Sequence, residues 1–100
     1  MNTVRLSLLT IVAESVLRER LIGDLQRSGA RGHTLTDVSG EGSRHRRVGD
    51  IHGGNFKIET IVSPEVAERL LKVLTTDYFP NYAVIAYVTP VEVVRGEKYV

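Results

Sequence analysis

A glycine- and arginine-rich segment, Ser39–Arg47, has the residue types needed to hold a phosphate group. Glycines adopt positive φ at little cost, so their backbone N–H groups can turn inward and form a concave anion site. Ser43 adds a hydroxyl donor, and the arginines offer planar guanidinium groups that match phosphate oxygens. The spacing fits neither a Walker A motif nor the dinucleotide-binding fingerprint. The segment therefore indicates a phosphate clamp of another type, and a solvated surface loop is the alternative interpretation.

Other kinds of site find little support in the residues. His33, His45 and His52 lack the spacing of metal ligands, and the chain contains no cysteine that would complete a zinc site. Glu59 and Glu92 fall on predicted strands without a facing acid or a trapped base, which general acid–base catalysis would require. We therefore expect a protein that is not an enzyme and that holds no metal or resident cofactor.

Composition limits the class of protein further. The chain has 100 residues, 42% of them hydrophobic, and 13 Lys and Arg against 12 Asp and Glu. Such a balanced charge creates no general attraction for nucleic acid or acidic membranes. No signal-peptide pattern and no apolar run of about 18–20 residues is present, and the lack of cysteine fits a reducing compartment. We expect one cytoplasmic domain that neither binds nucleic acid nor inserts into a membrane.

Hydrophobic periodicity predicts the elements that must position the loop. Apolar alternation predicts a strand over Val4–Val12, and leucines spaced by four predict a helix that ends at Ser28-Gly29. A second strand over His33–Val38 leads into a long polar loop, residues 39–55. The remaining predicted elements are a strand over Phe56–Val62, a helix capped by Ser63, a strand over Ala83–Thr89 and a short fifth strand over Glu92–Val94.

The order β-α-β-β-α-β predicts an α+β, ferredoxin-like sandwich with a short extra C-terminal strand and a long flexible loop between strands two and three. Right-handed crossovers place both helices on one face of the sheet. Leu9, Ile11, Ile61, Ile85 and Tyr87 cannot all point at the helices, because their neighbours compete for that side. An apolar second face on a domain of this size favours burial against other copies, so we expect a symmetric oligomer.

Several segments together resemble one protein family. Residues Ser28–Arg44 resemble the segment that leads into the T-loop of P-II signal-transduction proteins, and Phe56–Glu59 resembles the strand after that loop. The branch that the chain resembles most is the P-II-like group associated with bicarbonate transporters and carboxysomes. The similar segments there are Gly40–Arg47, Tyr78–Ala83 and Pro90–Val93.

This resemblance implies one P-II-like domain over residues 1–100, with a flexible T-loop at about residues 40–55. It implies a homotrimer that binds adenine nucleotides between subunits, with bicarbonate as a further ligand. The T-loop would then engage a bicarbonate transporter or a carboxysome protein. The nucleotide-binding positions that it implies are Gly40, Gly42, Ser43, Arg44 and Arg47 at the loop, Ile61 beside the adenine, Val84 at the approach to the nucleotide, and Arg95 and Lys98 if the C-terminal tail folds back.

Departures from the family pattern refine the expected ligand. Glu92 and Val94 stand where classical P-II proteins carry two arginines that grip the outer phosphates. A site with fewer cations favours AMP, cyclic AMP or ADP over ATP. The loop contains no tyrosine, so regulation by uridylylation cannot operate on it.

The sequence thus favours a regulator that senses adenine nucleotides and signals to inorganic-carbon uptake or fixation. The main alternative is a ferredoxin-like oligomeric regulator or scaffold that binds another small metabolite. An RNA-binding domain of the same topology is disfavoured, because the first strand has no aromatic residue for base stacking. An acyl phosphate hydrolase is disfavoured because residues 13–16 do not resemble an anion-binding loop.

Overall fold

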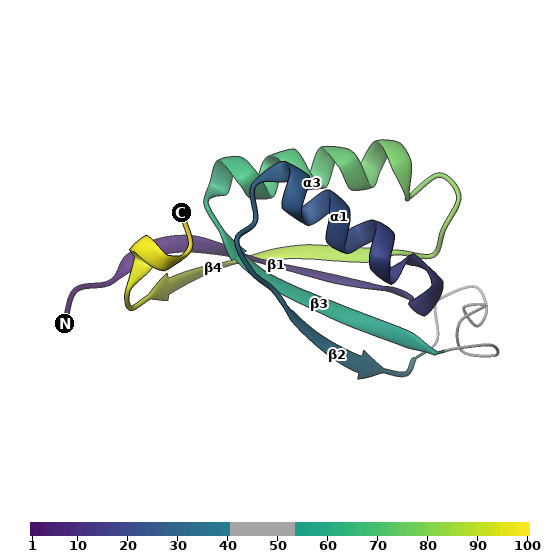
Figure 1. Ribbon diagram of the computed structural model, residues 1–100, viewed down its shortest axis with the longest axis horizontal. Coiled ribbons are helices and arrows are strands. Elements are labelled where there is room, and N and C mark those ends of the chain that lie inside the picture. The colour runs from purple at the N-terminus through teal and green to yellow at the C-terminus, as the bar shows by residue number, and fades with distance from the viewer. Residues whose placement is uncertain (41–53) are drawn as a thin grey trace.

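The computed structural model describes residues 1–40 and 54–100. Its elements follow the order β-α-β-β-α-β, which confirms the predicted ferredoxin-like α+β fold (Figure 1). The elements are β1 (Val4–Glu14), the 3-10 turn η1 (Ser15–Leu17), α1 (Arg18–Ser28), β2 (Thr34–Val38), β3 (Asn55–Val62), α3 (Pro64–Asp77), β4 (Ile85–Val93) and the 3-10 turn η2 (Gly96–Lys98).

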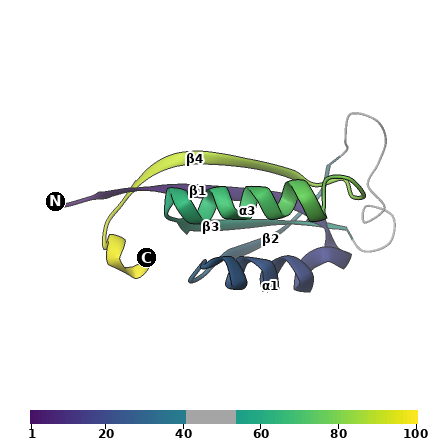
Figure 2. The same cartoon turned by 90° about the horizontal axis from the view of Figure 1, so that it is seen from above.

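The four strands form one antiparallel sheet in the order β2-β3-β1-β4. Strand β1 is central and pairs over its length with β3 on one side and β4 on the other; Leu9, for example, lies opposite Thr60 and Val88. Both helices cover the same face of this sheet, as Figures 1 and 2 show. The other face carries no helix and is called the open face below.

The hydrophobic core lies between the sheet and the two helices. Leu9 and Ile11 of β1 are fully buried there against leucines of α1 and α3. Because side chains alternate along a strand, Ile61, Ile85 and Tyr87 fall on the open face, where Ile85 and Tyr87 remain 46% and 52% exposed. The expectation that these five residues do not all point at the helices is confirmed, and the pairing register decides which residue belongs to which face.

Both predicted helix boundaries are confirmed, and each has a local cause. Ser63 caps α3, its hydroxyl accepting a hydrogen bond from the backbone N–H of Val66 at 3.2 Å, and Pro64 opens the helix. Gly29 ends α1 in the left-handed conformation, at φ 112°, which a residue with a side chain rarely adopts. These two ends fix where the chain leaves each helix for the sheet.

The predicted fifth strand is wrong. The structure has one continuous strand, β4, in which Pro90 lies opposite Ser7 and Glu92 lies opposite Arg5. Proline interrupts a strand in the middle of a sheet, because it lacks a backbone N–H to donate, but it is tolerated on an edge strand. Since β4 is an edge strand, Pro90 does not divide it.

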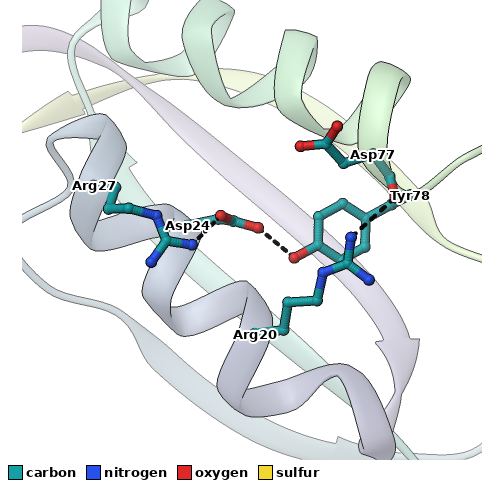
Figure 3. A network of polar contacts seen from close by, with 5 residues as sticks. All are labelled: Arg20, Asp24, Arg27, Asp77 and Tyr78. Carbon is teal, nitrogen blue, oxygen red and sulfur yellow. Dashed lines mark hydrogen bonds and ion pairs between the residues drawn. The ribbon is translucent and has the colours of Figure 1, made fainter.

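A polar cluster joins α1 to the turn that follows α3 (Figure 3). The fully buried Tyr78 donates its hydroxyl hydrogen to Asp24, and Asp24 also forms an ion pair with Arg27. Arg20 lies over the Tyr78 ring, 4.4 Å from its centroid, and donates to the backbone carbonyl of Asp77 at 3.3 Å. The cluster therefore fixes the end of α3 against α1.

None of the helices in the described parts of the chain is long and apolar enough to cross a membrane.

Candidate functional site

A cavity of about 490 Å³ opens on the open face, at the end of the sheet where β3 finishes. It is formed by β1, β3, the segment before β2 and the C-terminal tail, four parts of the chain that are distant in sequence. Its lining residues are Leu8, Arg31, Gly32, His33, Thr34, Glu59, Ile61, Lys98 and Tyr99.

The register of the sheet explains the floor of this cavity. Leu8 lies opposite Ile61, and Glu59 lies opposite Thr34, so these four side chains come together on the open face. Leu8 and Ile61 supply apolar surface, whereas Glu59 and Thr34 supply oxygen atoms beside it. A flat ligand with an apolar face and a polar edge matches this floor.

The far wall comes from the C-terminal tail. Residues Val4–Leu6 of β1 pair only with β4, so these two strands run past the end of β3 (Figure 1). Beyond β4 the chain turns back at Arg95 and forms η2, which brings Lys98 and Tyr99 to the cavity. The tail thus lies where the sheet is only two strands wide.

A partly buried hydrogen bond holds the opposite wall. The Thr60 hydroxyl of β3 donates to the backbone carbonyl of Gly32 at 2.6 Å. Since Gly32 and His33 both line the cavity, this bond fixes the segment before β2 against β3.

The charged groups around the cavity are available to a ligand. Arg31 and Lys98 are basic, His33 carries an imidazole, and Glu59 carries a carboxylate. Within residues 1–40 and 54–100 none of these four groups makes an ion pair with another side chain, since the two ion pairs there are Arg18–Asp37 and Asp24–Arg27. Cations beside an apolar floor suit an anion that carries a planar group.

The residues that sequence analysis singled out fall into two groups. Ile61 and Lys98 line the cavity together, and Arg95 lies in the turn that leads to it. Gly40 and Val84 lie at the other end of the sheet, Gly40 shortly after the end of β2 and Val84 directly before the start of β4. Gly42, Ser43, Arg44 and Arg47 lie outside the described residues.

The two groups are well separated within one chain. Ile61 pairs with Leu8, and Asn55, at the loop end, pairs with Glu14. The six residue-to-residue steps of β1 from Leu8 to Glu14 span about 20 Å. The described residues of the two groups therefore do not line one cavity within a single chain.

Val84 differs from the expected position in one respect. It packs, half-buried, against the hydrophobic core rather than at the cavity. Val84 therefore lies at the loop end of the sheet and does not line the cavity.

Sequence reasoning missed several cavity residues. It places Leu8 and Glu59 on strands without a role in a site, it gives His33 no ligand to bind, and it does not consider Tyr99. The period-two spacing of Glu59 and Ile61 places both on the face of Ile61, and that signal was sufficient to find Glu59.

No group of three or more His, Asp or Glu side chains in the described part of the chain is arranged to hold a metal ion.

Comparison with known families identifies the fold. Residues 6–98 match the model of the family described as nitrogen regulatory protein P-II. The chain therefore belongs to the P-II family.

Solved structures agree with this assignment. A protein of Thermus thermophilus described as PII-like and signaling is 55% identical to this P-II protein, with a TM-score of 0.87 over 100% of both chains. CPII of Thiomonas intermedia K12, a nitrogen regulatory PII-like protein solved with ADP, AMP and bicarbonate, is 24% identical, with a TM-score of 0.88 over 98% of this chain and 96% of that one. At that identity the second likeness shows the shared fold.

Proposed function

We propose that this P-II protein is a non-catalytic sensor of adenine nucleotides, with the base bound in the cavity at Ile61. The observation that carries this proposal is the meeting of Ile61, Lys98 and Glu59 around one cavity. Leu8 and Ile61 pack against the face of the adenine, and the Glu59 carboxylate accepts a hydrogen bond from its amino group. The structures of CPII with ADP, AMP and bicarbonate support the choice of ligand.

The phosphates require the loop end of a second copy. We propose one P-II domain over residues 1–100, assembled as a homotrimer, with a T-loop at about residues 40–55. In this arrangement Ser43, Arg44 and Arg47 of one subunit hold the phosphates of a nucleotide whose base lies in the cavity of its neighbour, while Gly40 and Gly42 let the loop approach. The half-exposed Ile85 and Tyr87 on the open face support burial against another copy.

The ligand is AMP, cyclic AMP or ADP rather than ATP. Glu92 and Val94 are both exposed and supply no cation at the tail end of the sheet, and Glu92 accepts a hydrogen bond from the Thr3 hydroxyl at 2.9 Å. Arg95 and Lys98 are the basic residues of the tail that remain near the cavity. Such a site discriminates against the charge of a third phosphate.

The signal passes through the T-loop. A bound nucleotide that favours one loop conformation changes which surface is offered to a partner, and the shift is set by the differential affinity for the two conformations. The partner class that we propose is an inorganic-carbon transporter or a carboxysome protein in the cytoplasm, with bicarbonate as a second ligand. A regulator or scaffold that binds another small metabolite in the same cavity is the alternative.

Calorimetric titration tests this proposal. AMP, cyclic AMP, ADP and ATP are each titrated into the protein, with and without bicarbonate. We expect one site per chain, with ATP the weakest of the four ligands, and an affinity that bicarbonate alters. Binding of ATP as tight as that of ADP would contradict the proposed selectivity, and no heat from any nucleotide would favour the alternative ligand.

A further inference from the structure

The C-terminal turn that walls the cavity has an unusual backbone. Arg95 adopts the left-handed conformation, at φ 62° and ψ 48°, and it is the one non-glycine residue with positive φ in the described parts of the chain. A residue with a side chain is held in that region only when its surroundings determine it. The turn is therefore imposed by tertiary contacts.

The contact that imposes it is between Gly96 and Val4. Gly96 is buried against β1, and a Cβ atom at this position would lie 2.6 Å from the Cβ atom of Val4. Only a glycine allows so close an approach. The backbone N–H groups of Lys98 and Tyr99 then donate to the carbonyls of Arg95 and Gly96, both at 3.0 Å, and close the turn.

The turn delivers an aromatic side chain to the cavity. Tyr99 is half-buried and lines the cavity together with Leu8 and Ile61 of the floor. Its hydroxyl has no hydrogen-bond partner among the side chains and backbone groups of the described residues, and it is the only Phe or Tyr in this lining. Aromatic rings stack on nucleobases and gain affinity from that contact.

We propose that the Tyr99 ring is a further ligand contact, which packs on the base of the bound nucleotide, and that Arg95 and Gly96 are positioning residues that place it. This inference rests on the nucleotide site proposed above. The tail is then a preset wall of the site, fixed before the ligand arrives.

The test is calorimetric titration of ADP into the full-length protein and a set of tail variants. Tyr99→Ala is expected to weaken ADP binding about tenfold, whereas Tyr99→Phe, which keeps the ring, stays within about twofold of the unchanged protein. Val100→Ala alters the next residue, which is exposed and does not line the cavity, and is the matched control. It is expected to leave the affinity unchanged.

The positioning role is tested by altering the close contact between Gly96 and Val4. Gly96→Ala introduces the clash with Val4 and is expected to weaken ADP binding about tenfold; adding Val4→Gly removes the opposing Cβ atom and restores most of the affinity. Circular dichroism and the oligomeric state show whether each variant is folded.

The outcomes separate the two proposals. If the unchanged protein binds ADP and Tyr99→Ala binds it equally well, the role of Tyr99 is overturned and the nucleotide site stands. If Gly96→Ala weakens binding and Val4→Gly does not restore it, the positioning by this contact is overturned. If the unchanged protein does not bind ADP, both proposals fail, because the ring then has no base to contact.

Discussion

The cluster around Tyr78 and the cavity around Ile61 both gather charged side chains, and they arrange them in opposite ways. In the cluster, Asp24 accepts from Tyr78 and pairs with Arg27, while Arg20 covers the Tyr78 ring (Figure 3). Around the cavity, Arg31, Glu59 and Lys98 make no ion pair within the described residues.

The charged groups of the Tyr78 cluster therefore stabilise the fold, whereas those around the cavity remain accessible to a ligand. In the cluster the fully buried Tyr78 and the largely buried Asp24 satisfy one another, while Arg20 and Arg27 lie at the exposed side. Removing the Tyr78 hydroxyl therefore leaves Asp24 without that donor. Groups that surround an open cavity keep their hydration and exchange it for a ligand. The same residue types therefore predict stability effects in the first region and affinity effects in the second.

The largest effect is expected at the centre of the cluster. Tyr78→Ala removes a fully buried ring and should lower the unfolding free energy by about 3–5 kcal/mol, as other buried aromatic-to-alanine changes do. Urea denaturation at fixed protomer concentration measures it. A loss below about 1 kcal/mol would show that the ring is not part of the core.

A pH series on Tyr78→Phe sharpens the same point. Burial, and then the hydrogen bond to Asp24, raise the pKa of Tyr78 far above its ordinary value. Below about pH 10 the phenol keeps its proton in both states. Above that pH the unfolded chain loses the proton and the folded chain keeps it, so the unfolding free energy falls as pH rises.

The expected result is a pH-dependent difference in unfolding free energy between Tyr78→Phe and the unchanged protein. At pH 7, Tyr78→Phe should be less stable than the unchanged protein by about 1–3 kcal/mol, because Asp24 loses its donor. Above about pH 10 that difference should narrow by up to about 1.4 kcal/mol per pH unit, since phenylalanine does not titrate. Thermal unfolding at several pH values tests this, and a constant difference would contradict it.

A smaller effect is expected at Thr60, whose hydrogen bond both stabilises the fold and holds one wall of the cavity. Thr60→Val keeps the shape of the side chain and removes the hydroxyl that donates to the Gly32 carbonyl. It should cost about 1 kcal/mol of stability and weaken ADP binding several-fold, because Gly32 and His33 line the cavity. Unchanged affinity in a variant that has lost this stability would show that the bond does not position the wall.

The smallest effect on stability is expected at the cavity itself. Lys98→Ala should change the unfolding free energy by less than about 0.5 kcal/mol, because this exposed side chain has no ion-pair partner among the described residues. It should nevertheless weaken ADP binding about tenfold through the loss of a charge-assisted hydrogen bond. Lys72→Ala, at another exposed lysine on α3, is the control, and equal affinities of the two variants would contradict the assignment of Lys98 to the site.

How much of this was predictable depends on the range of the interactions involved. The ends of the helices at Gly29 and Ser63 are set by neighbouring residues, so local patterns predict them well. The face on which Leu9 and Ile11 lie depends on strand register, which is a contact between distant segments. The continuity of β4 through Pro90 also could not be predicted locally, because it depends on the position of β4 at the edge of the sheet.

The site shows the same limit. The resemblance to P-II proteins indicates Ile61 and Lys98, and the structure places both at one cavity. The role of Tyr99 depends on the path of the tail, which follows from the contact of Gly96 with Val4, at the opposite end of the chain. No local sequence pattern predicts such a contact.

A crystal structure of the protein with bound ADP tests the proposed nucleotide site, because it locates the base and the phosphates separately. We expect the adenine ring in the cavity between Ile61 and Tyr99, with the phosphates directed towards the loop end of a neighbouring subunit. A nucleotide bound elsewhere, or held entirely within one chain at the loop end, would contradict the proposed site.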